Sequence, residues 1–285
     1  MSYQIQEINR RIQANPKEFV DACDAAYAEK IERAARAIAE NVRTCPIVLL
    51  SGPSGSGKTT TAMKIAEALR GMGIGSQSLA MDDYFRTVNP RTAPRTPEGD
   101  IDFESPACLD MDLLGKHLNA LARGEEIHLP RYNFVTRVQS GPIGRPMRLG
   151  KDEVVVCEGI HALNDDIAAY CPDAFRLYIS ARSVVVDGDG QEIFKGTWMR
   201  LLRRLVRDSN FRGTPAAATL DMWANVRRGE KRFISPFKER ANLMFDSSFP
   251  CEVSIMKNFA APLLAAVPEG AERYAVSYTH LTLPT

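Results

Sequence analysis

Short, continuous runs of hydrophobic residues recur along the chain, and stretches with apolar residues at helical spacing separate them. Unbroken apolar runs are typical of strands buried on both faces of a parallel sheet. The runs are PIVLLS at 46–51, QSLAM at 77–81, EVVVC at 153–157, FRLYIS at 175–180 and CEVSIM at 251–256. Their alternation with helical stretches predicts βαβ units, and hence an α/β fold with a doubly wound parallel sheet of about five strands.

The chain before the first of these runs has a helical pattern. Asn15-Pro16 separates two amphipathic stretches in residues 1–44, and the second carries apolar Ile31, Ala34 and Ile38 on one face. We therefore expect an N-terminal helical extension, over 1–44, that packs against a main domain at 45–275.

Two other segments depart from the strand–helix rhythm. Residues 86–150 are rich in Pro, Arg and Gly and hold one helical stretch, LDMDLLGKHLNALARGE. We expect an insertion there, lying over the carboxyl edge of the sheet, where open α/β sheets bind ligands. The last ten residues, VSYTHLTLPT, read as a tail at 276–285 that is not native, the alternative being an ordinary frayed terminus.

Composition and charge restrict the class of protein. The 285 residues are 45% hydrophobic and 25% charged, with a formal net charge of +1, so no broad field attracts nucleic acid or an anionic membrane. The longest apolar runs fall well short of the roughly 20 residues that a spanning helix needs. The six cysteines form no CxxC pair, which favours reduced thiols and disfavours a structural zinc site. We expect a cytoplasmic protein without nucleic-acid or membrane partners; a homo-oligomer is compatible with the sequence.

The sequence GPSGSGKT at 52–59 matches the pattern GxxxxGK[ST] of a phosphate-binding loop (P-loop), between a predicted strand and a predicted helix. The glycines let backbone N–H groups curl around phosphate oxygens, and the helix N-terminus adds the positive end of its dipole. Lys58 can reach the β- and γ-phosphates, and the Thr59 hydroxyl can ligate Mg²⁺. A plain Gly/Ser turn is the alternative. The predicted nucleotide-binding residues are Gly52, Ser54, Gly55, Ser56, Gly57, Lys58, Thr59 and Thr60.

Carboxylates follow two of the predicted strands. MDDYF at 81–85 places Asp82 and Asp83 just past the second run, and VVVCEGIH at 154–161 ends a run in Glu158. A kinase needs a carboxylate to take or orient the acceptor hydroxyl proton and to help hold the metal. Alone, an Asp pair in a solvated turn or a surface acid at a strand end would give the same pattern. We assign no role to His161.

Arginines are concentrated in RLLRRLVRDSNFRG at 200–213. Arg200, Arg204 and Arg207 have helical spacing, and Arg212 follows them. Arginines in a mobile segment can close over transferring phosphates and neutralise their charge. A solvated basic helix or a nucleic-acid patch are the alternatives. With a P-loop in the same chain, we expect an arginine-bearing lid near 200–232.

Taken together and in order, these motifs resemble the uridine kinase and phosphoribulokinase family of P-loop kinases, and most of all the bacterial nucleoside kinases that look like uridine kinase. The resemblance covers roughly residues 30–275. It rests on GPSGSGKTT, MDDYF, DFESPACLDMDLL, LPRYNF, VVVCEGIHALN, RLLRRLVRDSNFRG and VRRGEKRFISPF. It implies ATP, Mg²⁺, an acceptor hydroxyl and an arginine lid, whose arginines fall on Arg204, Arg207 and Arg212.

The resemblance also implies roles for single residues. The catalytic acid falls on Asp82 rather than Asp83, and the metal-linked Glu on Glu158, so the implied metal ligands are Thr59, Glu158 and Asp82. On the acceptor side, the family's acid falls on Glu104 of FESP and its Tyr on Tyr132 of RYNF.

Three places depart from the family's pattern. Arg137 holds the place where uridine-cytidine kinases carry a His that contacts the base, TWMR at 197–200 replaces a common Thr-Asp-x-Arg, and DGDGQEIFKG at 187–196 diverges. These departures concern base specificity rather than phosphoryl transfer. We count Arg137 with Glu104 and Tyr132 as the predicted acceptor-binding residues.

The sequence therefore predicts an ATP-dependent kinase, with Asp82, Lys58 and the three lid arginines as catalytic residues and a nucleoside 5′-hydroxyl as the acceptor. One alternative changes the acceptor to a sugar phosphate or another small alcohol. A second is a regulator that binds ATP without catalysis, for which Asp82 and Glu104 would have little use. A third is a nucleic-acid-binding ATPase, which the near-zero net charge disfavours.

Overall fold

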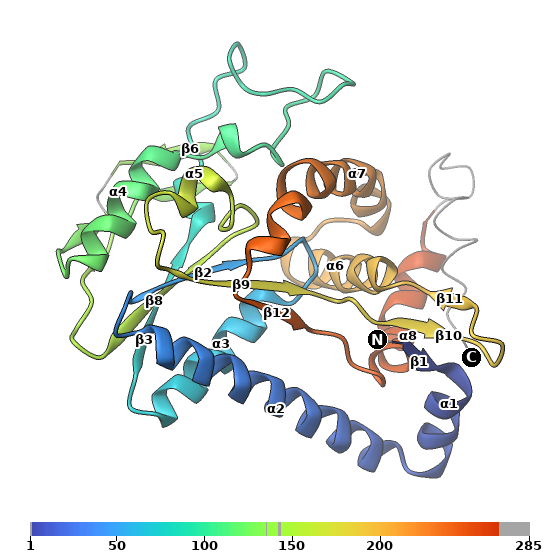
Figure 1. Ribbon diagram of the computed structural model, residues 1–285. Helices are drawn as coiled ribbons and strands as arrows, with labels where there is room; N and C mark the ends of the chain where they lie inside the picture. Colours follow the sequence, from blue (N-terminus) through green and yellow to red (C-terminus); the bar gives the residue numbers. More distant parts are fainter. Residues whose placement is uncertain (1, 135, 142–143, 268–285) are drawn as a thin grey trace.

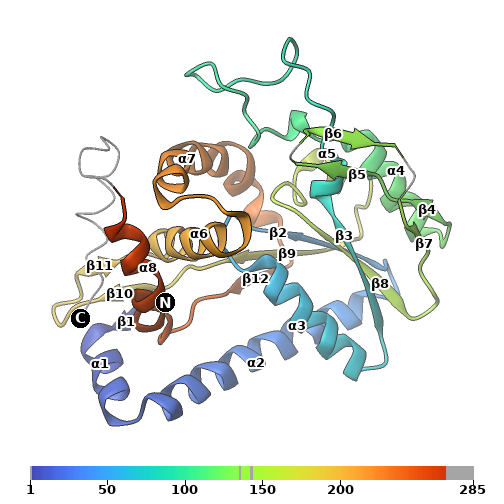
Figure 2. The same cartoon turned by 180° about the vertical axis from the view of Figure 1, so that it is seen from behind.

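A computed structural model describes residues 2–134, 136–141 and 144–267. At its centre is a sheet of five parallel strands, as the sequence predicts, with helices on both faces (Figures 1 and 2). In spatial order the strands are β12 Leu243–Asp246, β9 Phe175–Ser180, β2 Ile47–Ser51, β8 Glu153–Glu158 and β3 Gly75–Ala80. The first strand of this sheet in the chain, β2, lies in the middle, so the strand order reverses beside it. Open α/β sheets bind ligands at the carboxyl ends of the strands at such a point.

One predicted strand is wrong. Residues 251–256 do not join the sheet but begin helix α8, Glu252–Ala265, and the fifth strand is β12, which pairs with β9 through Met244 and Tyr178. The apolar run CEVSIM looks like a strand by itself. In the folded chain it continues into a helix that buries Val253, Ala260 and Leu264. The true strand, LMFD, has four residues and is too short to show a pattern.

The layers follow from alternating side chains on the strands. Val48 and Leu50 of β2 point into a core formed with α2 Pro16–Asn41 and α3 Lys58–Gly71. Ile47 and Leu49 point the other way, into a core that includes α4 Met111–Ala122 and the short α5 Asp165–Ala168. Because successive residues of a strand face opposite sides, one unbroken apolar run serves both cores. Figure 1 shows α2 and α3 below the sheet and α4 above it.

The N-terminal region contains α1 Ile5–Ala14 and the long α2. The Asn15 side chain accepts a hydrogen bond from the Glu18 N–H at 3.2 Å, and Pro16 occupies the first helical position, which together start α2. Before α1, β1 Ser2–Gln4 pairs with β10 Val184–Val186, which pairs in turn with β11 Glu192–Phe194. This three-stranded sheet was not predicted, because its strands have three residues each; the divergent segment 187–196 includes its turn.

The region 86–150 contains more order than the single predicted helix. Besides α4 it holds two small antiparallel pairs and a 3₁₀ turn, and another 3₁₀ turn precedes it. These are β4 Ile127–His128 with β7 Pro146–Met147, β5 Arg131–Asn133 with β6 Val138–Ser140, η1 Met81–Tyr84 and η2 Pro106–Cys108. Strands of two or three residues carry no readable alternation, so the sequence could not predict them.

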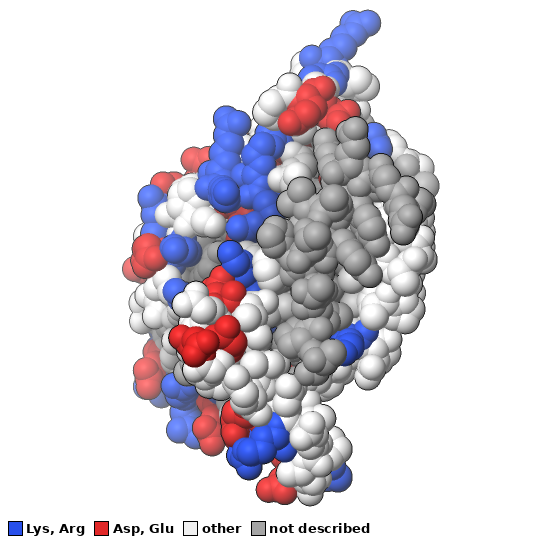
Figure 3. Space-filling model, turned by 90° about the vertical axis from the view of Figure 1, so that its right-hand side faces the viewer, with Lys and Arg blue, Asp and Glu red and all other residues white. Residues whose placement is uncertain are grey.

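The arginine-rich region consists of α6 Gly196–Arg212 and α7 Ala216–Gly229, followed by a π-helical turn, η3 Glu230–Ile234, and η4 Ser235–Arg240. Helices α6, α7 and α8 share a core with α1 and the start of α2. Figure 3 shows basic and acidic side chains interspersed over this end of the molecule.

No helix in the described part of the chain is both long and apolar enough to span a membrane. All six cysteines are buried free thiols. The predicted tail at 276–285 lies outside the described residues.

Candidate functional site

The P-loop runs from β2 into α3 and approaches neighbouring backbone closely. A Cβ on Gly52 would lie 2.1 Å from the Ile179 carbonyl oxygen. Gly55 has a φ of +73°, and a Cβ there would lie 2.4 Å from the Arg200 carbonyl oxygen. Only glycine fits at either position. The loop ends at the N-terminus of α3, where no side chain caps the helix, so its first N–H groups can bind an anion.

Lys58 curls back over this loop. Its Nζ donates hydrogen bonds to the carbonyl oxygens of Gly52, at 2.8 Å, and Pro53, at 3.3 Å. Burial lowers the pKa of Lys58 to about 8, and the carboxylates of Glu158 and Asp82 oppose that shift. The lysine charge is thus partly desolvated, and a phosphate would stabilise it further.

Thr59 and Glu158 form the second part of the site. The Thr59 hydroxyl donates to Glu158 Oε1 at 2.7 Å. Glu158 ends β8, and Asp82 comes two residues after the end of the neighbouring β3, so the parallel sheet brings both carboxylates to one edge. Hydroxyl and carboxylate oxygens suit Mg²⁺. No group of three His, Cys, Asp or Glu residues within the described ranges could hold a metal alone, so the other ligands would come from phosphates and water.

The arginines of α6 reach the P-loop, and three of them share one carboxylate as their counterion. Arg204 Nη1 donates to Ser54 Oγ at 2.8 Å. Arg204, Arg207 and Arg212 all lie within 3.6 Å of the carboxylate of Asp208, whose side chain is 2% exposed. Sequence reasoning missed Asp208, although it stands four residues from both Arg204 and Arg212, the spacing of neighbours on a helix.

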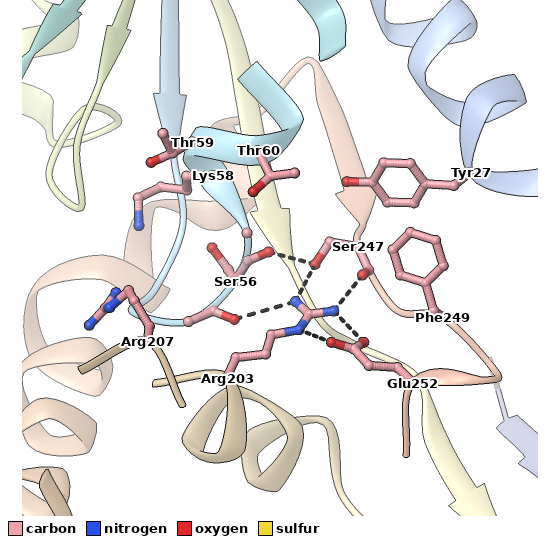
Figure 4. Close-up of a pocket in the computed structure, with 12 residues that line it drawn as sticks. Tyr27, Ser56, Lys58, Thr59, Thr60, Arg203, Arg207, Ser247, Phe249 and Glu252 are labelled. Carbon is pink, nitrogen blue, oxygen red and sulfur yellow. Dashed lines mark hydrogen bonds and ion pairs between the residues drawn. The ribbon is translucent and has the colours of Figure 1, made fainter. Parts of the chain in front are cut away.

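Two further arginines fasten α6 to the P-loop. Arg200 is 2% exposed, donates to the Ser54 carbonyl at 3.0 Å and pairs through two hydrogen bonds, at 2.8 and 2.7 Å, with Glu230. Arg203 donates to the Gly55 carbonyl at 3.3 Å and to Glu252 Oε2 at 2.6 Å, as Figure 4 shows. No sequence pattern pointed to Arg203, because its partners come from the loop and from α8.

Glu104, in the insertion, lies within electrostatic range of this cluster. Burial raises its pKa to about 7. The charges of Arg204 and Lys58 oppose this shift, and those of Asp102 and Asp82 add to it. All four groups are therefore within electrostatic range of Glu104. The end of α7 packs directly on it, since a Cβ on Gly229 would lie 2.3 Å from the Glu104 Cβ. Next to this contact, Arg228 pairs with Asp102 at 3.3 Å.

Tyr132 lies in an aromatic group outside the P-loop cleft. Its ring centroid is 5.4 Å from that of Phe85 and 5.0 Å from that of Phe134. Its hydroxyl is buried and has no hydrogen-bond partner among the residues described. The cavity that Tyr132 lines includes neither Glu104 nor any P-loop residue, so the structure does not bring the two predicted acceptor residues into one cavity.

Arg137 connects this aromatic group with the Glu104 segment. It has a left-handed backbone, with φ 58°, and its guanidinium carbon lies 5.4 Å from the ring centroid of Phe103, the residue before Glu104. Burial raises the pKa of Tyr132, and the positive charge of Arg137 partly offsets that rise. Arg137 thus lies near Tyr132 and beside the residue that precedes Glu104.

A tightly turned phosphate loop at the end of the central strand, a half-buried lysine above it, and carboxylates at the carboxyl ends of β8 and β3 define the P-loop kinase class. The family model described as "Phosphoribulokinase / Uridine kinase family" matches residues 47–253. The chain belongs to this family, and the resemblance inferred from its motifs is confirmed. Members of the family are phosphotransferases.

Relatives support the same assignment. A uridine kinase from Deinococcus deserti is 30% identical over 199 residues, which cover 70% of this chain and 86% of the relative. A uridine kinase from Halobacterium salinarum is 28% identical, over 68% of this chain and 77% of the relative. A solved structure described as a fructose transport system kinase from a Silicibacter species matches with a TM-score of 0.50 and 19% identity. It covers 70% of this chain and 94% of the other, and it shows the fold alone.

Proposed function

We propose that this protein transfers the γ-phosphoryl group of ATP to the 5′-hydroxyl of a ribonucleoside. The observation that carries the proposal is a group of charges around the P-loop: Lys58 and Arg204 both hydrogen-bond to the loop, and both lie within electrostatic range of Glu104, as Asp82 does. Cations there suit a transferring phosphate, and carboxylates suit an uncharged alcohol. The uridine kinases among its relatives support a nucleoside as that alcohol.

On the donor side, the P-loop N–H groups would bind the phosphate oxygens while Lys58 and Arg204 offset their charge. Both cations are already placed by hydrogen bonds to the loop, so little reorganisation is needed during the reaction. Thr59 and Glu158 would hold Mg²⁺, which supplies further neutralisation of the phosphate oxygens.

On the acceptor side, Asp82 would accept the proton of the attacking hydroxyl as the oxygen–phosphorus bond forms in line with the leaving ADP. Glu104 suits a ribose, because a carboxyl group can accept hydrogen bonds from vicinal hydroxyls. It suits a sugar phosphate less, because a phosphate would add negative charge beside a carboxyl group that burial already makes costly to ionise. Tyr132 and Arg137 would line the outer part of the acceptor site, which supports a role in choosing the base.

The test supplies ATP and Mg²⁺ with a panel of acceptors and follows ADP release, with Asp82→Asn as the inactive reference. The panel holds uridine, cytidine, adenosine, guanosine, inosine, ribose, fructose, ribulose 5-phosphate, glycerate and pantothenate. We expect ADP release with pyrimidine nucleosides and a 5′-monophosphate product by ³¹P NMR. Turnover restricted to the non-nucleosides would refute the nucleoside acceptor. ATP binding without turnover on any acceptor would favour a regulator.

A further inference from the structure

A cleft beside the P-loop continues beyond the phosphate site. It encloses about 400 Å³ and runs from Gly55–Thr60 to Tyr27, Phe249 and Glu252. That volume lies in the range of roughly 300–1,000 Å³ that small-molecule sites occupy. Figure 4 shows Lys58 and Arg207 at one side of this cleft and the Tyr27 and Phe249 rings at the other. Tyr27 belongs to α2, which precedes the residues 47–253 matched by the family model.

Tyr27 is fixed by contacts on three sides. Its ring stacks on Phe249, with centroids 4.5 Å apart and planes 17° apart, and meets Phe245 edge-on at 5.4 Å. Its hydroxyl lies 2.7 Å from Thr61 Oγ1, which donates to the Gly57 carbonyl at 2.8 Å. Because a threonine hydroxyl has a single hydrogen, Tyr27 must be the donor to Thr61. The N-terminal extension is therefore bonded to the helix that ends the P-loop.

The segment that carries Phe249 is fixed as well. The Asp246 carboxylate accepts from the Ser248 N–H at 3.0 Å and hydroxyl at 2.6 Å, and its carbonyl accepts from Lys30 of α2 at 3.0 Å. Ser247 Oγ donates to the Ser56 carbonyl at 2.6 Å. Phe249 is half-buried: one face stacks on Tyr27, other parts pack against the two cores on either side, and the rest lines the cleft.

We infer that Phe249, backed by Tyr27, is the apolar wall on which the base of the nucleotide donor packs, so that the N-terminal extension is part of the donor site. The inference rests on the proposed function in taking a nucleotide as donor. Lys58, Asp82 and Glu104 mark the end of the site where the γ-phosphate reacts. A nucleotide with its phosphates on the loop extends away from them, and in this cleft that direction leads to the two rings. Planar bases stack favourably on such rings.

The experiment compares two ligands by titration calorimetry: Mg·ATP, and Mg·tripolyphosphate, which has the phosphates but no base. Phe249→Ala and Tyr27→Leu should each weaken Mg·ATP about tenfold, the usual scale of a lost base–aromatic stack, and leave Mg·tripolyphosphate within about twofold. Tyr27→Phe keeps the stack and should bind both ligands as the wild type does. Phe19→Leu is the matched control for Tyr27→Leu, since Phe19 is a buried aromatic of the same helix that belongs to a different core from Tyr27 and lines no part of the cleft.

The two ligands separate a base wall from a merely structural role. If Phe249→Ala weakens both ligands equally, or weakens neither, the wall is refuted. Thermal melting checks each variant; should Tyr27→Leu not fold, the half-buried Phe249→Ala still decides. Because these titrations contain no acceptor, their failure is distinct from failure of the proposed nucleoside acceptor, which the turnover panel tests. Wild-type protein that binds neither ligand would refute the nucleotide donor itself, and the wall with it.

Discussion

The two halves of the site differ in how firmly their polar groups are held. Around the P-loop, Arg200, Arg203 and Arg204 each hydrogen-bond to the loop and form an ion pair with a carboxylate, and all three are largely buried; the Ser56 hydroxyl has no partner among the described residues. Around the insertion, the Tyr132 hydroxyl is unpaired among the described residues and Phe134 is 61% exposed.

This contrast indicates where each property of the protein resides. A donor half whose arginines are already paired with carboxylates is organised before the nucleotide arrives, which suits a donor that is the same in every turnover. An acceptor half with an unpaired hydroxyl and an exposed aromatic has polar groups and surface left over for a ligand. We therefore expect mutations on the donor side to affect stability or the chemical step, and mutations on the acceptor side to affect mainly recognition of the acceptor.

The largest effect should come from Lys58→Ala. It removes the cation above the loop and should lower kcat by about 10³-fold, as expected for a group that stabilises transition-state charge. The thermal midpoint should not fall, because Lys58 is a charge whose burial is unfavourable. Steady-state kinetics and calorimetry measure both. Lys64→Ala, at an exposed lysine of the same helix, should be wild-type; turnover close to normal in Lys58→Ala would contradict the assignment.

Glu230→Gln tests whether the donor half is held by its buried ion pair. It leaves the Arg200 charge without its partner and should lower the free energy of unfolding by about 3 kcal/mol. Glu239→Gln breaks an exposed pair with Lys238 and should change it by less than about 0.5 kcal/mol. Urea unfolding at neutral pH gives both values, and equal losses would show that the buried pair is not special.

The pH dependence of this pair has a definite sign. Burial raises the pKa of Glu230, but the hydrogen bonds and charge of Arg200 lower it more, so the folded-state pKa is below the unfolded one. Its contribution to stability is therefore present above the unfolded pKa and lost as the pH falls through the folded one. The difference between Glu230→Gln and wild type should shrink under acid.

Asp82→Asn tests the carboxylate that we propose takes the proton of the acceptor hydroxyl. We expect kcat to fall by about 10²-fold, the usual contribution of a general base, with Mg·ATP affinity little changed. Asp83→Asn is the matched variant and should lose much less. A crippled Asp83→Asn beside an active Asp82→Asn would show that the roles of the two residues are exchanged.

Glu104→Gln should act on recognition, raising KM for the acceptor about tenfold while leaving ADP affinity unchanged.

Glu104 also gives the stability of the protein a pH dependence. Burial raises its pKa to about 7 in the folded state, above the pKa in the unfolded chain, so between these two pKa values the folded protein holds a proton that the unfolded chain has lost. Stability therefore falls as the pH rises through that window. Glu104→Gln removes this loss. Its thermal midpoint should therefore exceed that of the wild type at about pH 8 and match it at about pH 4. A lower midpoint at the higher pH would contradict the environment described for Glu104.

The smallest effect should come from Tyr132→Phe. It deletes a buried hydroxyl that has no partner in the described structure, so stability should rise by about 1 kcal/mol, while KM for the acceptor rises about threefold. Tyr84→Phe is the opposite case, because its hydroxyl lies 2.8 Å from His117 Nδ1, and it should lose about 1 kcal/mol. Loss of stability in both variants would mean that Tyr132 has a partner after all.

Much of this protein is encoded locally and can be read from the order of its residues. Strands with unbroken apolar runs predict a buried parallel sheet, and a parallel sheet carries the residues after its strands to one edge. The sequence pattern is therefore enough to place the P-loop, Asp82 and Glu158 together. The prediction of a strand at 251–256 was wrong because a short apolar run fits a strand and a helix equally well. In the folded protein the segment is helical and buries Val253 in the core.

The class of fold, the phosphate site and the family follow from the amino-acid sequence alone, because each depends on residues that are neighbours in the chain or follow strands of one sheet. Tertiary packing selects the distant side chains that complete the site. Arg203 finds Glu252, three arginines share Asp208, and Tyr27 of the first long helix stacks on Phe249 near the last. No local pattern encodes such pairs, since they depend on how whole helices pack on the sheet, and a helix can place any of its faces there until the core is formed.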